Sequence, residues 1–398
     1  MKLLVFSHTP PPHHGQSYAV KLMLENYGGD RRRVKFRKLP ENSFGIECYH
    51  VNARFSKTLE DIGEFQTGKI LLVIYYCLQA LWCRFRYGVD HFFYIPAPGK
   101  PVAIYRDWLV MLICRPFFKK VIFNWRAAGL AKWLETSVSI RFRAFTYHRM
   151  RDADLSIVLS DYSRRDAEKL TARRIAVVAG GIPDPCPQFE SEILPRRRER
   201  ISRLNRVLAG SLPAASEDDR TVNVIYVALV SRDKGAFDAV EGVLLANDGF
   251  PLRFRLRVVG GFASQAEEAE LRDLVRRRGG DNIEILGFVP AEKKFQALRD
   301  ADLFCFPTYY LAEGQPASLM EALAYGLPIV STRWRAIPEM FPPAYPGMVD
   351  PKSPVQIAAA LRRLATEDQA AMLRGLFLQR FTIEKHIVNM AEAFRSVE

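Results

Sequence analysis

Short apolar runs alternate along the chain with longer segments whose apolar residues have helical spacing. The first run covers residues 3–6 and is followed, after a loop rich in proline and histidine, by a helical pattern over residues 16–27. Continuous apolar strands between helices are typical of a parallel sheet that is covered on both faces. The later runs fall into two series, at 92–95, 121–123, 155–159 and 175–178, and at 222–230, 254–259, 283–286, 303–306 and 327–331. The pattern predicts two doubly wound α/β domains.

A stretch rich in proline and charge separates the two series. It holds four prolines within residues 183–195 and continues into the charged sequence RRRERISRLNR. Two domains are also the natural expectation for 398 residues. We therefore expect a first domain over 1–185, a linker with a charged helix over 186–220, a second domain over 221–375 and a final amphipathic helix over 376–398.

The sequence Asp-Ala-Asp occurs twice, at 152–154 and at 300–302, each time immediately before an apolar strand. A metal-binding Asp-x-Asp is one interpretation. Because both halves carry the motif with the same kind of strand after it, we favour a structural role in a helix-to-strand turn.

Positive charge is concentrated in the first half of the chain. The net charge is +13, and residues 1–190 hold 29 Lys and Arg against 17 Asp and Glu, whereas residues 221–398 hold 21 against 22. A basic half indicates an anionic partner, and the runs of aromatic and basic residues at 81–88 and 114–120 favour a membrane surface. A solvated basic surface is the alternative. No RRM, KH or zinc-finger pattern occurs, so we expect no nucleic acid partner.

The cysteines and the apolar segments indicate the cellular location. The six cysteines form no CxxC pair, as expected of reduced thiols in a cytosolic protein. The opening MKLLVF is too short for the apolar part of a signal peptide. Residues 70–83 form the longest apolar stretch, shorter than the ~20 residues that span a bilayer, and we expect a buried helix there. The expected location is cytoplasmic, with peripheral contact at the inner face of the membrane left open.

Two glutamates, Glu313 and Glu321, stand eight positions apart in EGQPASLMEALAYGLPIVST. Pro316 suits the first position of a helix and Gly326 suits its end. The start of a helix attracts phosphate and sugar oxygens, and Gly314 would let a ligand approach the backbone closely. Glu313 could then face a sugar, and Glu321 could accept two hydrogen bonds from a ribose diol. The alternative makes Glu313 a capping acid and Glu321 a surface residue.

The spacing of Glu313 and Glu321 resembles the E-x7-E motif of the retaining glycosyltransferases of family 4. Further similar stretches are GGIPDP at 180–185, SRDKG at 231–235, RVVGG at 257–261 and IEILGFVP at 283–290. The resemblance implies the GT-B fold, in which two Rossmann-like domains face each other across a cleft and a C-terminal helix packs back on the N-terminal domain. It also implies that Glu313 lies beside the transferred sugar and that Glu321 binds the ribose.

The resemblance extends to residues that would act on the donor phosphates. Lys234 matches the lysine with which the family neutralises the diphosphate, and Leu229 stands where the family has an arginine. Arg232 is close enough to substitute for it, or is an ordinary loop arginine. Arg126 aligns with a histidine that related enzymes place near the anomeric carbon, and Gly15 matches the glycine of their N-terminal loop. The remaining donor-binding residues that the resemblance implies are Gly261, Phe288, Gly314, Gln315, Pro316, Ala317 and Ser318.

The implied function is a hexosyltransferase that works with retention and without a metal or organic cofactor. The donor would be a UDP-, GDP- or ADP-sugar, and the acceptor a glycan or a lipid-linked glycan in cell-surface polysaccharide synthesis. The departures at Leu229 and Arg126 leave two alternatives open, a nucleotide-sugar-binding protein without activity or with altered activity, and a nucleotide-sugar epimerase.

Overall fold

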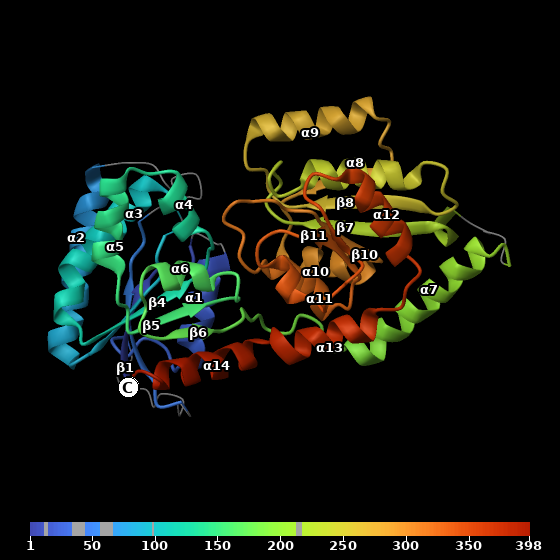
Figure 1. Ribbon diagram of the computed structural model, residues 1–398. Helices are drawn as coiled ribbons and strands as arrows, with labels where there is room; N and C mark the ends of the chain where they lie inside the picture. The colour runs from blue at the N-terminus through green and yellow to red at the C-terminus, as the bar shows by residue number, and fades with distance from the viewer. Residues whose placement is uncertain (12–14, 34–43, 56–66, 98, 212–216) are drawn as a thin grey trace. The chain divides into compact units, whose positions relative to one another are not determined.

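The chain forms two compact units that are each built on one parallel sheet. A computed structural model describes residues 1–398 except 12–14, 34–43, 56–66, 98 and 212–216. The first unit comprises Met1–Gly181 with Ile383–Glu398, and the second comprises Ile182–Thr382 (Figure 1). Each unit has a sheet of six strands that all run parallel. The predicted pair of doubly wound α/β domains is therefore confirmed.

The sheet of the first unit has the strand order β2-β1-β3-β4-β5-β6. Its edge strand β2 was not predicted, because its sequence ECYHVN mixes polar and apolar residues. The predicted strands contain longer apolar runs, since buried parallel strands contact helices on both faces. The strands are β1 (Lys2–Ser7), β2 (Glu47–Asn52), β3 (His91–Tyr94), β4 (Lys120–Trp125), β5 (Leu155–Val158) and β6 (Ile175–Val177).

Alternate residues of each strand point into two separate cores. In β1, Leu4 and Phe6 pack toward α2 (Thr67–Tyr87) and α3 (Pro101–Cys114). Leu3 and Val5 pack on the opposite face, toward α1 (Gly15–Asn26) and α14 (Ile383–Arg395). This period of two is the geometry of a strand covered on both sides. The unit also contains η1 (Arg115–Phe117), α4 (Leu130–Thr136), α5 (Ile140–Met150) and α6 (Arg164–Lys169).

The last helix, α14, is an integral part of the first unit. The Tyr27 hydroxyl donates a hydrogen bond of 2.8 Å to the Ile387 carbonyl, and the ring of Phe394 meets that of Phe93 edge-on at 5.9 Å. Both contacts are buried. The chain returns to the first unit between Thr382 and Ile383, seven residues after the boundary expected from the sequence.

The sheet of the second unit has the strand order β12-β11-β10-β7-β8-β9. The strands are β7 (Thr221–Val227), β8 (Arg253–Val259), β9 (Ile283–Gly287), β10 (Leu303–Phe306), β11 (Ile329–Thr332) and β12 (Met348–Val349). Helix α8 (Ala236–Asn247) packs on β8 and on α12 (Pro354–Leu364). The unit also contains η3 (Glu217–Asp219), α9 (Gln265–Arg277), α10 (Ala291–Asp300), α11 (Ala317–Ala324), η4 (Ile337–Met340) and α13 (Ala370–Arg380).

The segment expected to be a linker lies within the second unit. It forms η2 (Phe189–Ile193) and the charged helix α7 (Leu194–Leu208). The buried guanidinium of Arg197 donates hydrogen bonds to the carbonyls of Tyr325 (2.9 Å) and Ala301 (2.8 Å), at the C-terminal ends of α11 and α10. A cation is well placed at such ends, because their carbonyls have no intrahelical donor. These hydrogen bonds therefore fix α7 to the ends of α10 and α11.

The two Asp-Ala-Asp sequences have the same structural role in both units. The Asp154 carboxylate accepts a hydrogen bond from the Val121 amide (2.9 Å), and Asp302 accepts one from the Asn223 amide (2.8 Å). Each aspartate thus anchors the strand beside the one that it precedes. This is the turn chemistry favoured over a metal site.

The apolar stretch at 70–83 departs from expectation. It lies in α2, where Val73 and Cys77 are buried but Leu71 and Leu78 are exposed. The helix is thus buried along one face only. Within the described parts of the chain, no helix combines the length and the apolar character needed to cross a membrane.

Candidate functional site

The candidate site lies at the carboxyl ends of β7 and β10, which are neighbouring parallel strands of the second unit. The loop after β7 covers residues 228–235, and the loop after β10 covers residues 307–316. The Tyr309 amide donates a hydrogen bond of 2.8 Å to the Asp233 carbonyl and joins the two loops. Ligands of open α/β sheets bind at this edge, outside the carboxyl ends of the strands.

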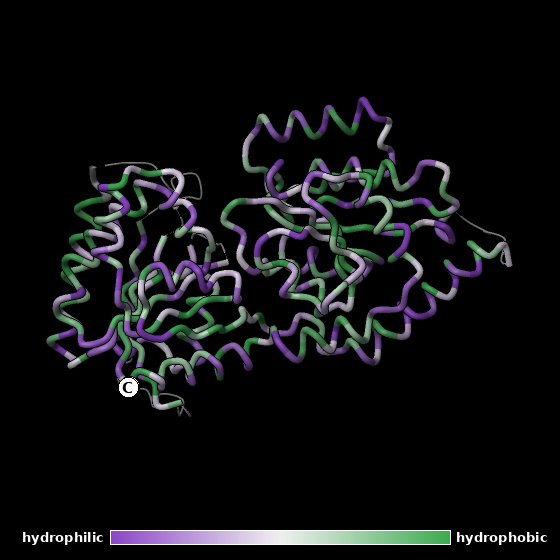
Figure 2. The backbone as a smooth tube through the Cα atoms, in the orientation of Figure 1, coloured by the Kyte–Doolittle hydropathy of each residue, from purple (hydrophilic) through white to green (hydrophobic). Residues whose placement is uncertain are grey.

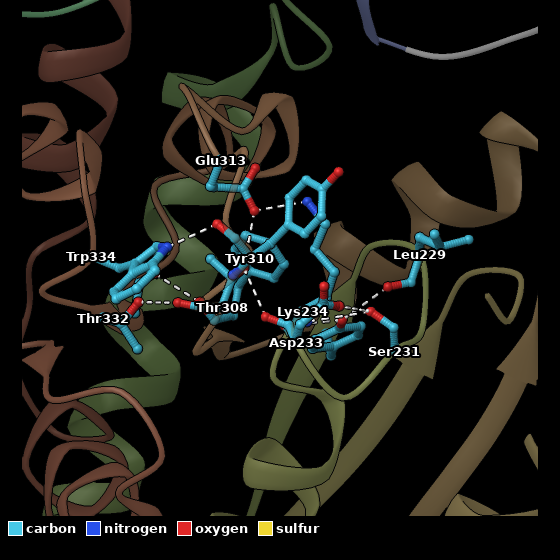
Figure 3. Close-up of polar contacts among 12 residues, drawn as sticks. Leu229, Ser231, Asp233, Lys234, Thr308, Tyr310, Glu313, Thr332 and Trp334 are labelled. Carbon is cyan, nitrogen blue, oxygen red and sulfur yellow. Dashed lines mark hydrogen bonds and ion pairs between the residues drawn. The ribbon is translucent and has the colours of Figure 1, made fainter. Parts of the chain in front are cut away.

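The loop after β7 is held in one position by close backbone packing. Gly235 has a φ of +79°, and a Cβ atom at this residue would lie 2.3 Å from the Pro307 carbonyl oxygen. The Tyr226 hydroxyl lies 3.2 Å from the carbonyl oxygens of both Leu229 and Lys234 (Figure 3). Only glycine combines this φ with so close an approach. This backbone packing therefore fixes the position of the Lys234 backbone, from which the side chain extends.

Lys234 and Glu313 form a nearly buried ion pair between the two loops. Lys234 Nζ lies 2.7 Å from Glu313 Oε2, and the Thr308 hydroxyl donates to the same oxygen at 2.9 Å (Figure 3). Lys234 Nζ also lies 4.4 Å from the centroid of the Tyr310 ring, whose backbone carbonyl accepts from Trp334 Nε1 at 2.8 Å. Such a pair needs these additional contacts to offset the loss of hydration.

The structure thus brings together two residues predicted from the sequence, 79 positions apart. Thr308, Tyr310 and Trp334 were not predicted. Thr308 and Tyr310 lie in the same loop as Glu313, whereas Trp334 follows β11 and reaches Tyr310 because β10 and β11 pair side by side.

Glu321 has a partner that the sequence did not reveal. On α11, its Oε1 atom lies 2.5 Å from Nζ of Lys294, which belongs to α10. Burial raises the pKa of Glu321, and the Lys294 charge and hydrogen bond oppose that rise. Ion pairs within one helix follow an i, i+4 spacing, whereas a pair between two helices leaves no such pattern.

Helix α11 begins one residue later than predicted. Pro316 is its N-cap, Ala317 is its first residue, and Gly326 follows its end with a φ of +59°. The helix has eight residues and is therefore about two turns long. The first amides of a helix have no intrahelical acceptor, so those of Ala317 and Ser318 are available for a ligand.

Arg232 has acidic partners on α9 that are separate from the Lys234–Glu313 pair. Its guanidinium pairs with Glu270 of α9 and lies 4.0 Å from the centroid of the Phe237 ring, and its amide donates to Glu267 Oε1 at 2.8 Å. The side chain is about half exposed. In this structure Arg232 has the contacts of an ordinary loop arginine, and the exposed Leu229 supplies no charge in its place.

The other predicted donor-binding residues lie at several positions. The Gly261 carbonyl accepts from the Val230 amide at 2.8 Å, beside the loop after β7. Phe288 follows β9 and is 84% exposed. Gly314 is buried and Gln315 is partly exposed, both just before α11. Gly15 is exposed at the start of α1 in the first unit.

Arg126, in the first unit, is a partly buried cation without a carboxylate partner among the described residues. It follows β4, burial lowers its pKa to about 10, and its Nε atom has no hydrogen-bond partner in the described structure. Burial and the charge of Arg126 lower the pKa of His386 on α14 to about 3. His386 Nδ1 lies 2.7 Å from the Ala179 carbonyl oxygen. A neutral histidine does not compensate the arginine, so this position suits an anionic ligand.

Residues 222–367 match the protein family described as "Glycosyl transferases group 1". The chain is 30% identical over 191 residues to WcaL of Escherichia coli (strain K12), which is named as a candidate colanic acid biosynthesis glycosyltransferase. This alignment covers 45% of the present chain and 46% of WcaL. The chain is also 27% identical over 185 residues to the amylovoran biosynthesis glycosyltransferase AmsK of Erwinia amylovora, and this alignment covers 44% of the present chain and 43% of AmsK. The matched region spans about half the length of these curated relatives.

Solved structures share the fold over the whole chain. The structure of HepE from Anabaena in complex with UDP and glucose has a TM-score of 0.64 at 17% identity, and the alignment covers 100% of both chains. Sucrose-phosphate synthase from Thermosynechococcus elongatus has a TM-score of 0.65 at 16% identity, covering 100% of this chain and 99% of the other. The fold is that of GT-B glycosyltransferases, and the family match supports a glycosyltransferase domain in the second unit.

Proposed function

We propose that this chain is a retaining glycosyltransferase that moves a sugar from a nucleotide-sugar to a glycan or lipid-linked acceptor in cell-surface polysaccharide synthesis. The observation that carries the proposal is the Lys234–Glu313 pair at the carboxyl ends of β7 and β10. The named roles of WcaL and AmsK in polysaccharide biosynthesis support the pathway class.

Lys234 would stabilise the leaving diphosphate. As the bond between the anomeric carbon and the phosphate oxygen breaks, negative charge develops on that oxygen. The acceptor hydroxyl then bonds to the anomeric carbon on the same face, and its proton passes to the departing phosphate. The ammonium of Lys234 is fixed by Glu313 and by the Tyr310 ring before the reaction, so little reorganisation is needed. This lysine can supply positive charge without a metal ion.

Glu313 and the start of α11 would hold the rest of the donor. The amides of Ala317 and Ser318 have no acceptor within the helix and suit phosphate oxygens, and Glu321 suits the ribose hydroxyls one to two turns further along the helix. Glu313 has a second oxygen beyond the one that accepts from Lys234 and Thr308, and this oxygen would accept from a sugar hydroxyl.

A thermal-shift screen against UDP-, GDP- and ADP-sugars without added metal tests the donor assignment. We expect one nucleotide class to raise the melting temperature, because a ligand that binds only the folded state stabilises it. The HepE complex with UDP and glucose makes the UDP-sugars the first choice. The proposal fails if no class stabilises the protein with or without a divalent metal.

Replacing Glu321 with glutamine should weaken donor binding about 10- to 100-fold and change turnover at saturation much less. The substitution removes the charge from two hydrogen bonds to the ribose, and charged hydrogen bonds contribute roughly 1.5–3 kcal/mol each at most. Isothermal titration calorimetry with the donor identified in the screen measures the change. Glu292→Gln, on the exposed surface of α10, is the matched control. Equal affinity in Glu321→Gln and the control would contradict the ribose assignment.

Replacing Arg126 with methionine should lower transfer while raising the stability of the first unit. The guanidinium is partly buried and has no carboxylate partner among the described residues, so the folded state loses an unfavourable group when it is removed. The enzyme would lose a contact with an anionic group of the substrate. Calorimetry and initial rates measure the two effects, and Arg143→Met, on α5, is the control. A destabilised variant with unchanged activity would show that Arg126 has only a structural role.

The position of Arg232 favours one competing function, a nucleotide-sugar-binding protein that has lost activity. Arg232 is paired to Glu270, and Leu229 stands in the family's arginine position, so neither residue adds a positive charge to that of Lys234 beside Glu313. Stabilisation by a nucleotide-sugar with neither hydrolysis of the donor nor transfer to any glycan acceptor would select this function.

A further inference from the structure

The outer face of α2 is an exposed apolar stripe. Its exposed residues recur every three or four positions, so they line one side of the helix: Leu71, Tyr75, Leu78, Trp82 and Phe85. The two ends of the stripe, Leu71 and Phe85, are 70% and 68% exposed. The opposite side, with Val73, Cys77 and Cys83, is already buried in the first unit. The hydropathy colouring shows the apolar character continuing along most of residues 70–83 (Figure 2).

The stripe continues onto a second element at the C-terminal end of α2. The ring of Phe85 meets the exposed ring of Phe117, in η1, edge-on at 5.9 Å, and Arg84 Nε donates to the Phe117 carbonyl at 2.7 Å. These contacts join α2 and η1 into one continuous apolar surface. We call this surface, made of the five stripe residues and Phe117, the α2 patch.

Basic residues surround the C-terminal end of the α2 patch. Arg86 is exposed, and the Lys119 side chain is 71% exposed. Asp90 pairs with both Arg84 and Lys119 at 2.9 Å, which leaves the cluster with excess positive charge. Helix α2 carries no acidic residue. An apolar face beside cations is complementary to a surface with an apolar interior and anionic headgroups.

We propose that the α2 patch docks the protein on a membrane surface that contains anionic lipids. The helix would lie in the plane of the interface, since it is not long and apolar enough to cross the bilayer. Tyr75 and Trp82 are of the residue types that are enriched at the boundary between headgroups and acyl chains. This inference specifies the membrane contact of the proposed function, which includes lipid-linked acceptors, and its readout does not depend on sugar transfer.

Vesicle flotation of the full chain tests the docking surface. We expect binding to vesicles of phosphatidylcholine with phosphatidylglycerol, and weaker binding to phosphatidylcholine alone. The triple variant Leu78→Gln, Trp82→Gln, Phe85→Gln should lose binding about tenfold or more, because affinity scales with the buried apolar area. Its melting temperature should stay close to that of the wild type, since all three side chains are exposed. The double variant Arg86→Gln, Lys119→Gln should reduce only the part of vesicle binding that is sensitive to salt.

A matched triple variant in the second unit separates docking from general surface hydrophobicity. Val355→Gln, Met372→Gln and Leu378→Gln also remove three exposed apolar side chains, and this variant should float like the wild type. Equal flotation of both triple variants, or no flotation of the wild type, would overturn the proposal. So would a wild-type dimer in solution that the α2 variant abolishes without any vesicle binding, since the patch would then bind a second copy. The donor-induced thermal shift should be unchanged in the α2 variant, so that loss of flotation and failure of the proposed function are distinguishable.

Discussion

Replacing Lys234 with methionine is expected to lower kcat/KM by about 10²–10³-fold, the loss typical of removing one pre-positioned donor to a developing negative charge. The ammonium lies 2.7 Å from Glu313 and beside the Tyr310 ring, in a site that is largely shielded from water. Electrostatic interactions are stronger in such surroundings than on the surface. Methionine retains much of the length of the side chain and removes the charge.

The rate of sugar release from the donor and the rate of transfer both measure this effect. Lys293→Met, on the exposed surface of α10, is the matched control and should leave kcat/KM unchanged. Circular dichroism checks that both variants fold. A Lys234→Met enzyme with wild-type kinetics would remove the proposed catalytic role, whatever its effect on stability.

The ion pair also predicts how two substitutions combine. In Lys234→Met the buried Glu313 loses its cationic partner, and with it one of the contacts that orient its carboxylate. In Glu313→Gln the lysine remains but is less firmly oriented. Because the two side chains share one interaction, the double variant should be less impaired than the product of the single losses predicts. Multiplicative effects on kcat/KM would indicate independent roles.

The buried strands of both sheets could be predicted because their sequences are continuously apolar. Strands β1, β4, β7 and β10 are buried along nearly their whole length, and burial on two sides leaves a strong sequence signal. The two-residue strand β12 is too short for such a signal. The charged helix α7 was expected in a linker because its charges suggest solvent, whereas Arg197 is buried at the ends of two other helices. Only the tertiary structure supplies those carbonyl partners.

The residues of the candidate site could be predicted where they belong to one sequence motif, as Glu313 and Glu321 do. Lys234 was identified by its own short motif, and the pairing of β7 with β10 places it beside Glu313. Lys294 had no such signal, because its contact with Glu321 depends on how α10 and α11 pack. The sequence left Arg232 as either a substitute cation at the diphosphate or a loop arginine, and in the structure it pairs with Glu270 on α9.

Replacing Gly235 with alanine is expected to destabilise the second unit by more than about 3 kcal/mol, several times the cost of an ordinary glycine substitution. Part of the cost is the left-handed backbone, since a φ of +79° costs an alanine about 1–2 kcal/mol. The larger part is the collision of the new Cβ with the Pro307 carbonyl oxygen, 2.3 Å away. Backbone on both sides must then move, because no flexible side chain is available to yield.

Gly249→Ala separates the two contributions. Gly249 also has a left-handed φ, +63°, but a Cβ there would meet no atom within 4 Å. This control should therefore lose only about 1–2 kcal/mol, the conformational cost alone. Urea unfolding followed by circular dichroism measures both free energies of unfolding, with the two units fitted as separate transitions. Equal losses in the two variants would mean that the contact between Gly235 and Pro307 is not tight.

The same substitution should also affect catalysis, because Gly235 directly follows Lys234. A shift of the loop away from Pro307 carries the start of the lysine side chain with it, and a misplacement of about 1 Å at a catalytic group can cost 10²-fold in rate. At temperatures where Gly235→Ala is still folded, its kcat/KM should therefore fall while that of Gly249→Ala does not. A folded Gly235→Ala enzyme with full activity would show that the position of Lys234 does not depend on this backbone contact.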